Sequence, residues 1–173
     1  MKTMTIRGDI EVPETGTSLN HLIFNYQSPD RTRAWKVIRA RTWVADWDSP
    51  SIASNDKAGM LSSVLATDVI PVNWGYSSSA SDNRVFGWNQ QHLLTRQATD
   101  ILLPQGGAYM QSDFIIDSDR IITNQLYLNY ANKLEGATGT TTVAYLIELE
   151  EMKITEDRAI ILQLKGIGQD IDA

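Results

Sequence analysis

Apolar and polar residues alternate in short runs along this chain, and turn-forming residues separate the runs. Successive side chains of a strand point to opposite faces, so alternation at period two predicts strands, and the intervening Pro, Gly, Asn, Asp and Ser predict chain reversals. The segments predicted as strands are 19–27, 34–45, 60–67, 84–94, 100–103, 113–116, 121–130 and 141–152. Strands that bury one face must also close their sheet edges, which a double-sheet jelly roll or a barrel achieves.

We predict an all-β fold, an eight-stranded double-sheet jelly roll, in preference to a barrel. With 173 residues, of which 42% are hydrophobic, the chain has room for one domain with a substantial core. The jelly-roll domain is predicted to span residues 19–173, preceded by an N-terminal arm at residues 1–18.

The segment EDRAIILQLK, residues 156–165, fits either a short C-terminal helix or an extra edge strand. Thr155 can cap a helix, and Glu156 and Asp157 would lie at the positive end of its dipole. The paired isoleucines and the alternation that follows them suit a strand equally well. In either form, the apolar stretch from Ala159 to Leu164 is expected to be covered by the sheet or by a neighbouring subunit.

The segment RTRAWKVIRARTWVADW, residues 31–47, concentrates basic and aromatic residues in an otherwise acidic chain. Read at period two, one face looks like a core face and carries Ala34, Lys36, Ile38, Ala40, Thr42 and Val44. Cationic and large aromatic side chains, which dominate the other face, are costly to bury without partners. We therefore predict a contact face, for a neighbouring subunit or for nucleic acid, made of Arg33, Trp35, Arg39, Arg41, Trp43 and Trp47.

Charge and composition favour protein as the partner of this face. The chain carries 15 Lys and Arg against 21 Asp and Glu, a net charge of -6, so its surface as a whole does not suit nucleic acid or an anionic membrane. Arg and Trp together are enriched at protein interfaces, whereas nucleic-acid readers spread basic residues over several elements. The predicted interface acids are Glu148 and Glu150, which share one face of the 141–152 strand.

Signals of catalysis and metal binding are poor. The chain has no cysteine, its two histidines lie far apart in the sequence, and no hydrolase or phosphate-binding motif is present, so we predict that it is not an enzyme and holds no cofactor. The metal candidates are two pairs of alternate acids, Asp46 with Asp48 and Asp117 with Asp119. Local turn hydrogen bonds are the simpler interpretation of both pairs, and no bound metal is expected. No apolar run is long enough to cross a membrane, and no membrane partner is expected.

The strand layout resembles a family. The segments AWKVIRARTWVAD, DSDRIITNQLYLNYANK and TTVAYLIELEEMKIT, within residues 19–165, are similar in layout and texture to single-jelly-roll viral coat proteins, such as the capsid proteins of small circular single-stranded DNA viruses. The resemblance implies a structural virion protein, located in the virion, that self-assembles into an icosahedral shell of many copies. The contacts would be sheet edges and the Arg/Trp face, with single-stranded nucleic acid inside the shell as a second partner. Coat proteins that package nucleic acid commonly carry a long basic N-terminal arm, whereas residues 1–18 hold only Lys2 and Arg7.

A carbohydrate-binding, lectin-like jelly roll is the alternative function. Aromatic side chains in or near polar loops can stack on a sugar. The candidate stacking residues are Trp43, Trp47, Trp74, Tyr76 and Trp88, with an Asp-rich loop holding calcium.

Overall fold

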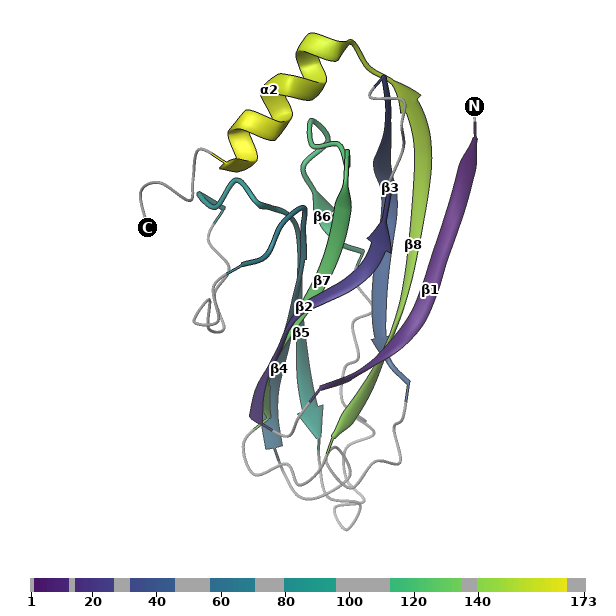
Figure 1. Ribbon diagram of the computed structural model, residues 1–173. Coiled ribbons are helices and arrows are strands. Elements are labelled where there is room, and N and C mark those ends of the chain that lie inside the picture. Colours follow the sequence, from purple (N-terminus) through teal and green to yellow (C-terminus); the bar gives the residue numbers. More distant parts are fainter. Residues whose placement is uncertain are drawn as a thin grey trace.

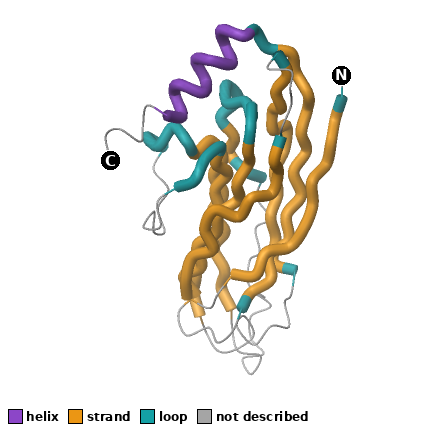
Figure 2. Tube along the Cα trace, viewed as in Figure 1, coloured by secondary structure: helices purple, strands orange, loops and turns teal. Residues whose placement is uncertain are grey.

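The chain forms two antiparallel β-sheets that pack face to face, with a helix at one end (Figures 1 and 2). The computed structural model describes residues 2–12, 15–26, 32–45, 57–70, 80–95, 113–134 and 140–167. The strands are β1 (Thr3–Val12), β2 (Thr15–Asn25), β3 (Arg33–Val44), β4 (Lys57–Ala66), β5 (Val85–Thr95), β6 (Ile115–Ile116), β7 (Gln125–Leu134) and β8 (Thr141–Lys153), and the helix is α2 (Glu156–Ile167). One sheet has the order β1-β8-β3 and the other the order β2-β7-β4-β5-β6.

The strands pair in a nested order, first with last, that defines a jelly roll. β1 pairs with β8, β2 with β7, and β4 with β5, all antiparallel. The remaining pair joins β3 to the segment around β6, through the bridges Trp35↔Ile122 and Arg41↔Asp113 and the hydrogen bond from Phe114 N to Ala40 O, 3.0 Å. This nesting is what two wound Greek keys produce, and the predicted all-β, eight-stranded jelly roll is confirmed.

The segment 113–122 closes one side of the sandwich, because it bonds to both sheets. Ile122 and Trp35 exchange two backbone hydrogen bonds of 2.7 and 2.9 Å on the three-stranded sheet. On the other sheet, β6 pairs with β5, and Asp117 N donates to Phe86 O at 2.7 Å. Each backbone group tied in this way is one that the open edges of the two sheets would otherwise leave unpaired.

Seven predicted strands overlap observed ones, and one observed strand, β1, was not predicted. β2 to β8 each overlap a predicted segment, and the predicted strand 100–103 lies outside the described residues. β1 was not predicted as a strand: it lies within residues 1–18, assigned to an N-terminal arm, and it pairs along its length with β8. Its inward positions include Gly8, and its outward positions are polar or charged, so its sequence shows less apolar character than the other strands.

The C-terminal segment is a helix, which decides between the two alternatives. Thr155 is its N-cap, since its hydroxyl accepts a hydrogen bond from Arg158 N, 3.3 Å. Glu156 and Asp157 occupy the first turn, where the helix dipole favours negative charge. Ala159 packs on a small buried cluster at the end of the sandwich, while Ile160 and Ile161 are 49% and 55% exposed.

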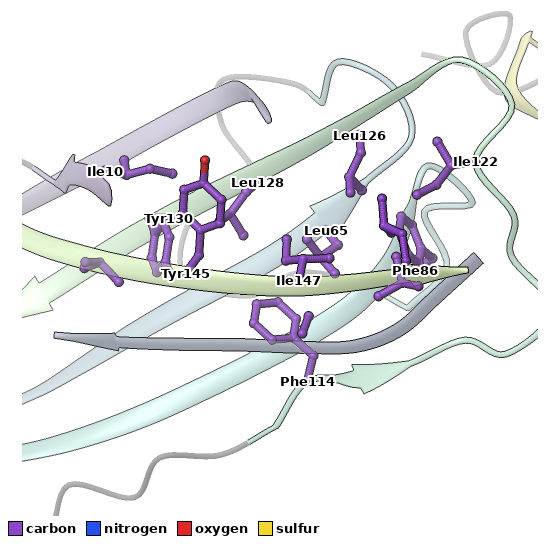
Figure 3. Packing of buried hydrophobic residues seen from close by; sticks show 14 of the residues in the cluster. Ile10, Leu65, Phe86, Phe114, Ile122, Leu126, Leu128, Tyr130, Tyr145 and Ile147 are labelled. Carbon is purple, nitrogen blue, oxygen red and sulfur yellow. The ribbon is translucent and has the colours of Figure 1, made fainter. Parts of the chain in front are cut away.

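The main hydrophobic core fills the space between the sheets (Figure 3). Its residues alternate along the strands with outward ones, as a half-buried strand requires. Leu65, Leu126, Leu128, Tyr130 and Ile147 are among the side chains at most 2% exposed. Burying such side chains contributes roughly 1.5–3 kcal/mol each to folding.

A polar link joins the sheets inside the sandwich. Asn89 and Gln91 on β5 both reach Thr42 on β3: Asn89 Nδ2 donates to Thr42 Oγ1 at 3.1 Å, and Gln91 Nε2 donates to Thr42 O at 2.8 Å. The Thr42 carbonyl lies beyond the last bridge between β3 and segment 113–122, so the Gln91 amide supplies the partner that a neighbouring strand would give.

Candidate contact face of the three-stranded sheet

A β-bulge in β3 exchanges the two faces of the predicted Arg/Trp strand. Val37 pairs with Leu149 and Arg39 with Glu148, so Ile38 is an extra residue that has no partner on β8. Before the bulge, Trp35 and Val37 belong to the core, and after it Ala40 does. The period-two separation of residues 33–47 into one core face and one contact face is therefore wrong, because one inserted residue reverses the direction of every later side chain.

Trp35 is a core residue, which corrects its assignment to the contact face. Its side chain is 3% exposed and meets the rings of Phe24 and Tyr26 edge-on, with centroids 6.0 and 6.1 Å away. The indole Nε1 is buried and has no hydrogen-bond partner in the described structure. Trp35 thus stabilises the sandwich and cannot contact a partner.

The outward side of the β1-β8-β3 sheet, here called the outer face, carries the predicted residues Arg39, Arg41, Trp43, Glu148 and Glu150. Arg33 lies two residues before Trp35 and therefore on the opposite side of the sheet, at the end of β3. Its side chains alternate with core residues along each strand. Its members are Thr3, Thr5, Arg7, Asp9 and Glu11 on β1, Ala144, Leu146, Glu148 and Glu150 on β8, and Lys36, Ile38, Arg39, Arg41 and Trp43 on β3. Trp47, Asp46 and Asp48 lie outside the described residues.

Cations of β3 lie beside acids of β8 on this face. Arg39 is the cross-strand partner of Glu148, and Lys36 is that of Glu150. Directly opposed residues on one face have Cβ atoms roughly 4.5–5.5 Å apart, within reach of opposite charges. The register thus places Glu148 beside a predicted cation, Arg39, on the same chain. The cation opposite Glu150 is Lys36, whose assignment to the core face is wrong, because it precedes the bulge and points outward.

The carboxylate partner of Arg41 is Asp113, which sequence analysis did not identify. Arg41 Nε donates to Asp113 Oδ1 at 2.5 Å, and the two side chains are 38% and 53% exposed. The hydrogen bond and the positive charge of Arg41 hold the pKa of Asp113 below its ordinary value, and the same contact raises the pKa of Arg41. Asp113 begins the segment that lies along β3, so only the strand pairing reveals this ion pair.

The other end of β3 carries a second exposed ion pair. Arg33 Nη1 lies 3.3 Å from Glu151 Oε1, and the Arg33 side chain is about half exposed. Exposed pairs add little to stability, so Arg41, which lies on the outer face, is available to exchange partners at a contact. Trp43, half-buried opposite the small Ala144, is the aromatic residue of the face.

The metal candidates that the structure describes form a turn. Asp117 Oδ1 accepts the backbone N–H of Asp119 at 3.0 Å, which is the local bond expected of an Asp in a reversal. In the described parts of the chain, no group of three or more metal-ligating side chains comes together.

A pocket next to this turn is built from internally paired charges. Asp82 and Arg84 form two hydrogen bonds of 3.0 Å each, and Arg120 Nη2 donates to Thr67 Oγ1 at 2.9 Å. Burial disfavours the charged form of Asp82, but its bonds from Arg84 outweigh that effect and lower its pKa. Burial lowers the pKa of Arg120. These groups hold the corner between β4 and β5 together, and we assign them a structural role.

The comparisons with known proteins show a weak likeness, among solved structures alone. No family model matches this sequence, and no curated protein matches it. Among solved structures, VP1 of Trichodysplasia spinulosa-associated polyomavirus, in complex with sialylated precision glycooligomers, is similar over 86% of this chain and 77% of that chain, with a TM-score of 0.37 and 10% identity. The jelly-roll assignment rests on the nested strand pairing, and no residue role is carried over from that structure.

Within the described ranges, no helix has the length and the apolar character needed to cross a membrane.

Proposed function

We propose that this chain is a structural subunit of a viral shell, and that the outer face of the β1-β8-β3 sheet meets a neighbouring subunit. The observation that carries the proposal is the bulge residue Ile38. It is 50% exposed and is flanked by Lys36 and Arg39, with Arg41 beyond them. An apolar centre inside a charged and aromatic rim is the usual composition of a protein interface, and bulges commonly re-aim one side chain.

Charge balance favours protein over nucleic acid as the partner of this face. Nucleic-acid affinity comes from cations that neutralise phosphates. Here Arg39 lies opposite Glu148, Lys36 opposite Glu150, and Arg41 pairs with Asp113. Phosphates would have to displace these carboxylates, whereas a second protein surface can share them through alternate ion pairs.

The exposed isoleucines of α2 support self-assembly. Ile160 and Ile161 remain about half exposed, although the helix is anchored through Ala159 on the cluster that includes Ala34 and Ile121. A helix that is anchored on one side and apolar on another suits burial against a neighbour. In a shell, this would be a contact separate from the outer face.

The lectin-like alternative has less support. Trp88 packs against the buried cluster of Val64, Ala66, Ile70, Val85 and Tyr127, so its ring is committed to the interior on that side. Trp43 lies on the outer face among charged residues. Trp47, Trp74 and Tyr76 lie outside the described residues.

The test compares assembly and DNA binding in the same variants. We expect Ile38→Ser and the double change Arg39→Ala with Arg41→Ala to reduce particle yield, measured by sedimentation velocity, while Lys153→Ala, an exposed cation of the same sheet, leaves it unchanged. Affinity for single-stranded DNA across a salt series is measured alongside. Normal particles whose log–log salt slope falls by about 0.7 per arginine would show that the face binds nucleic acid instead.

A further inference from the structure

We propose that β1 pairs antiparallel with β1 of a second copy across a two-fold axis that passes through Gly8. β1 is the end strand of its sheet, and no described strand pairs with its other side. Figure 1 shows it along the flank of the sandwich, on the side away from β3. A ten-residue strand with one edge unpaired is a ready template for another strand.

The hydrogen bonds of β1 identify which residues face the open edge. Glu151 N donates to Lys2 O at 2.8 Å, so Lys2 directs its backbone groups toward β8. Along an antiparallel strand, alternate residues bond to opposite sides, so even-numbered residues of β1 bond to β8. The odd-numbered residues, all exposed, present their N–H and C=O groups at the open edge: Thr3, Thr5, Arg7, Asp9 and Glu11.

Charge selects one register for this pairing. With Gly8 on the axis, Arg7 lies opposite Asp9 of the second copy, and Thr5 lies opposite Glu11 of the second copy. The axis repeats both pairs, so each Arg7 meets an Asp9. A register centred on Arg7 would oppose two arginines, and one centred on Asp9 would oppose two aspartates, and like charges directly opposite destabilise a sheet.

The same register matches the apolar side chains of the inward face. Ile6 lies opposite Ile10 of the second copy, and Met4 opposite Val12 of the second copy. Met4 and Ile6 are partly buried and pack on the core, so a second strand beside them extends that core. Gly8 on the axis permits the closest backbone approach, because opposed residues that share no hydrogen bond have Cα atoms only about 4.5 Å apart.

This contact deepens the proposed self-assembly, on which it rests, and the two proposals can fail separately. It joins two three-stranded sheets into one continuous sheet with the order β3-β8-β1-β1-β8-β3. Particles that form normally without it would leave the shell proposal standing and overturn the β1 contact.

Charge exchange tests the contact first. We expect Arg7→Asp and Asp9→Arg each to weaken dimerisation by about tenfold or more, because each single change opposes like charges at both symmetric positions. The double variant, with both changes, restores opposite charges and is expected to recover dimerisation to within about threefold of the original chain. Sedimentation velocity over a dilution series at low salt measures the change. Single variants that dimerise like the original chain, or a double variant that does not recover, would overturn the proposal.

Cross-linking tests the register independently of charge, in dimers or in particles. The chain has no cysteine, so Thr5→Cys with Glu11→Cys introduces the only thiols. In the proposed register these positions are opposed, with Cα atoms about 5.5 Å apart, within disulfide reach. Within one strand they are about 20 Å apart and cannot bond. Oxidation should therefore give covalent dimers of the double variant in excess of either single variant, and equal yields would contradict the register.

Discussion

The two edges of the β1-β8-β3 sheet differ in whether their backbone groups are paired within the chain. The β3 edge is closed within the chain: Trp35 and Ile122 exchange backbone hydrogen bonds, Phe114 bonds to Ala40, and the Gln91 side chain covers the Thr42 carbonyl. The β1 edge has no such cover in the described structure, and the residues whose backbone groups face it are exposed and polar or charged. From this difference we infer that the β3 edge contributes to folding of the single chain, whereas the β1 edge is available for association with a second copy.

The largest effect is expected at the closed edge. Trp35→Ala removes a core indole that packs against Phe24 and Tyr26, and it should lower the free energy of unfolding by about 3–5 kcal/mol. Urea denaturation measures the loss, with Trp43→Ala on the outer face as the matched control. Equal losses in the two variants would contradict the assignment of Trp35 to the core and of Trp43 to the surface.

Removal of the Gln91 amide from the β3 edge should lower the free energy of unfolding by less than Trp35→Ala does. Gln91→Ala leaves the Thr42 carbonyl buried without its amide partner, a loss of about 1–3 kcal/mol in the free energy of unfolding. Gln90→Ala, at the exposed neighbouring position on β5, is the control and should have little effect. If both variants unfold at the same urea concentration, water replaces the Gln91 amide and the edge is not closed by that side chain.

On β1, at the open edge, Gly8→Ala should destabilise the single chain slightly less than Gln91→Ala does. A Cβ atom at this position would lie 2.6 Å from the Tyr145 hydroxyl oxygen and 2.9 Å from its ring carbon Cζ, so the tyrosine must move. We expect a loss of about 1–2 kcal/mol, because overpacking is offset in part by the conformational entropy that glycine loses on folding. Thermal unfolding measures it, with Thr3→Ala, at an exposed outward position of the same strand, as the control. An unchanged melting temperature for Gly8→Ala would show that Tyr145 has room to move.

The smallest effect on stability is expected from Asp113→Asn, at the end of the closed β3 edge, and it should depend on pH. Its pKa is lowered from 3.8 by the hydrogen bond and charge of Arg41, so its contribution to stability is present above that ordinary value and is lost as pH falls through the lowered one. Melting temperatures between about pH 2 and pH 5 should fall slightly less steeply for Asp113→Asn than for the original chain. Identical slopes would mean that the Arg41 pair is absent in solution.

Alternation and turn residues were sufficient to predict the fold class, because seven of the observed strands, β2 to β8, overlap predicted ones. β1 escaped prediction because its inward row is interrupted by Gly8, where only glycine leaves room for the Tyr145 ring. Local propensity could not decide between a helix and an edge strand for the C-terminal segment. The helix forms because Thr155 caps it and Ala159 packs on a buried cluster.

The contact face was harder to predict than the fold. Period two assigned Trp35 and Arg39 to the same face, and a single bulge residue, Ile38, separates them. Nothing in the composition of RTRAWKVIRAR marks that position, because a bulge depends on the partner strand, which proceeds from Leu149 to Glu148 without a break. Asp113 was likewise invisible as the partner of Arg41, since the pair spans 72 residues of sequence.

Sedimentation velocity of the purified full chain, combined with negative-stain images of the same fractions, tests the central claim of self-assembly into a shell most directly. The account predicts closed particles of many copies, which shrink to smaller species when Ile160 and Ile161 are both changed to serine. Ile115→Ser, on β6, changes the most exposed isoleucine in the described ranges; it is the control and should leave the particles intact. A 19.3 kDa monomer or a simple dimer at every concentration and salt would contradict the claim that this chain builds a shell.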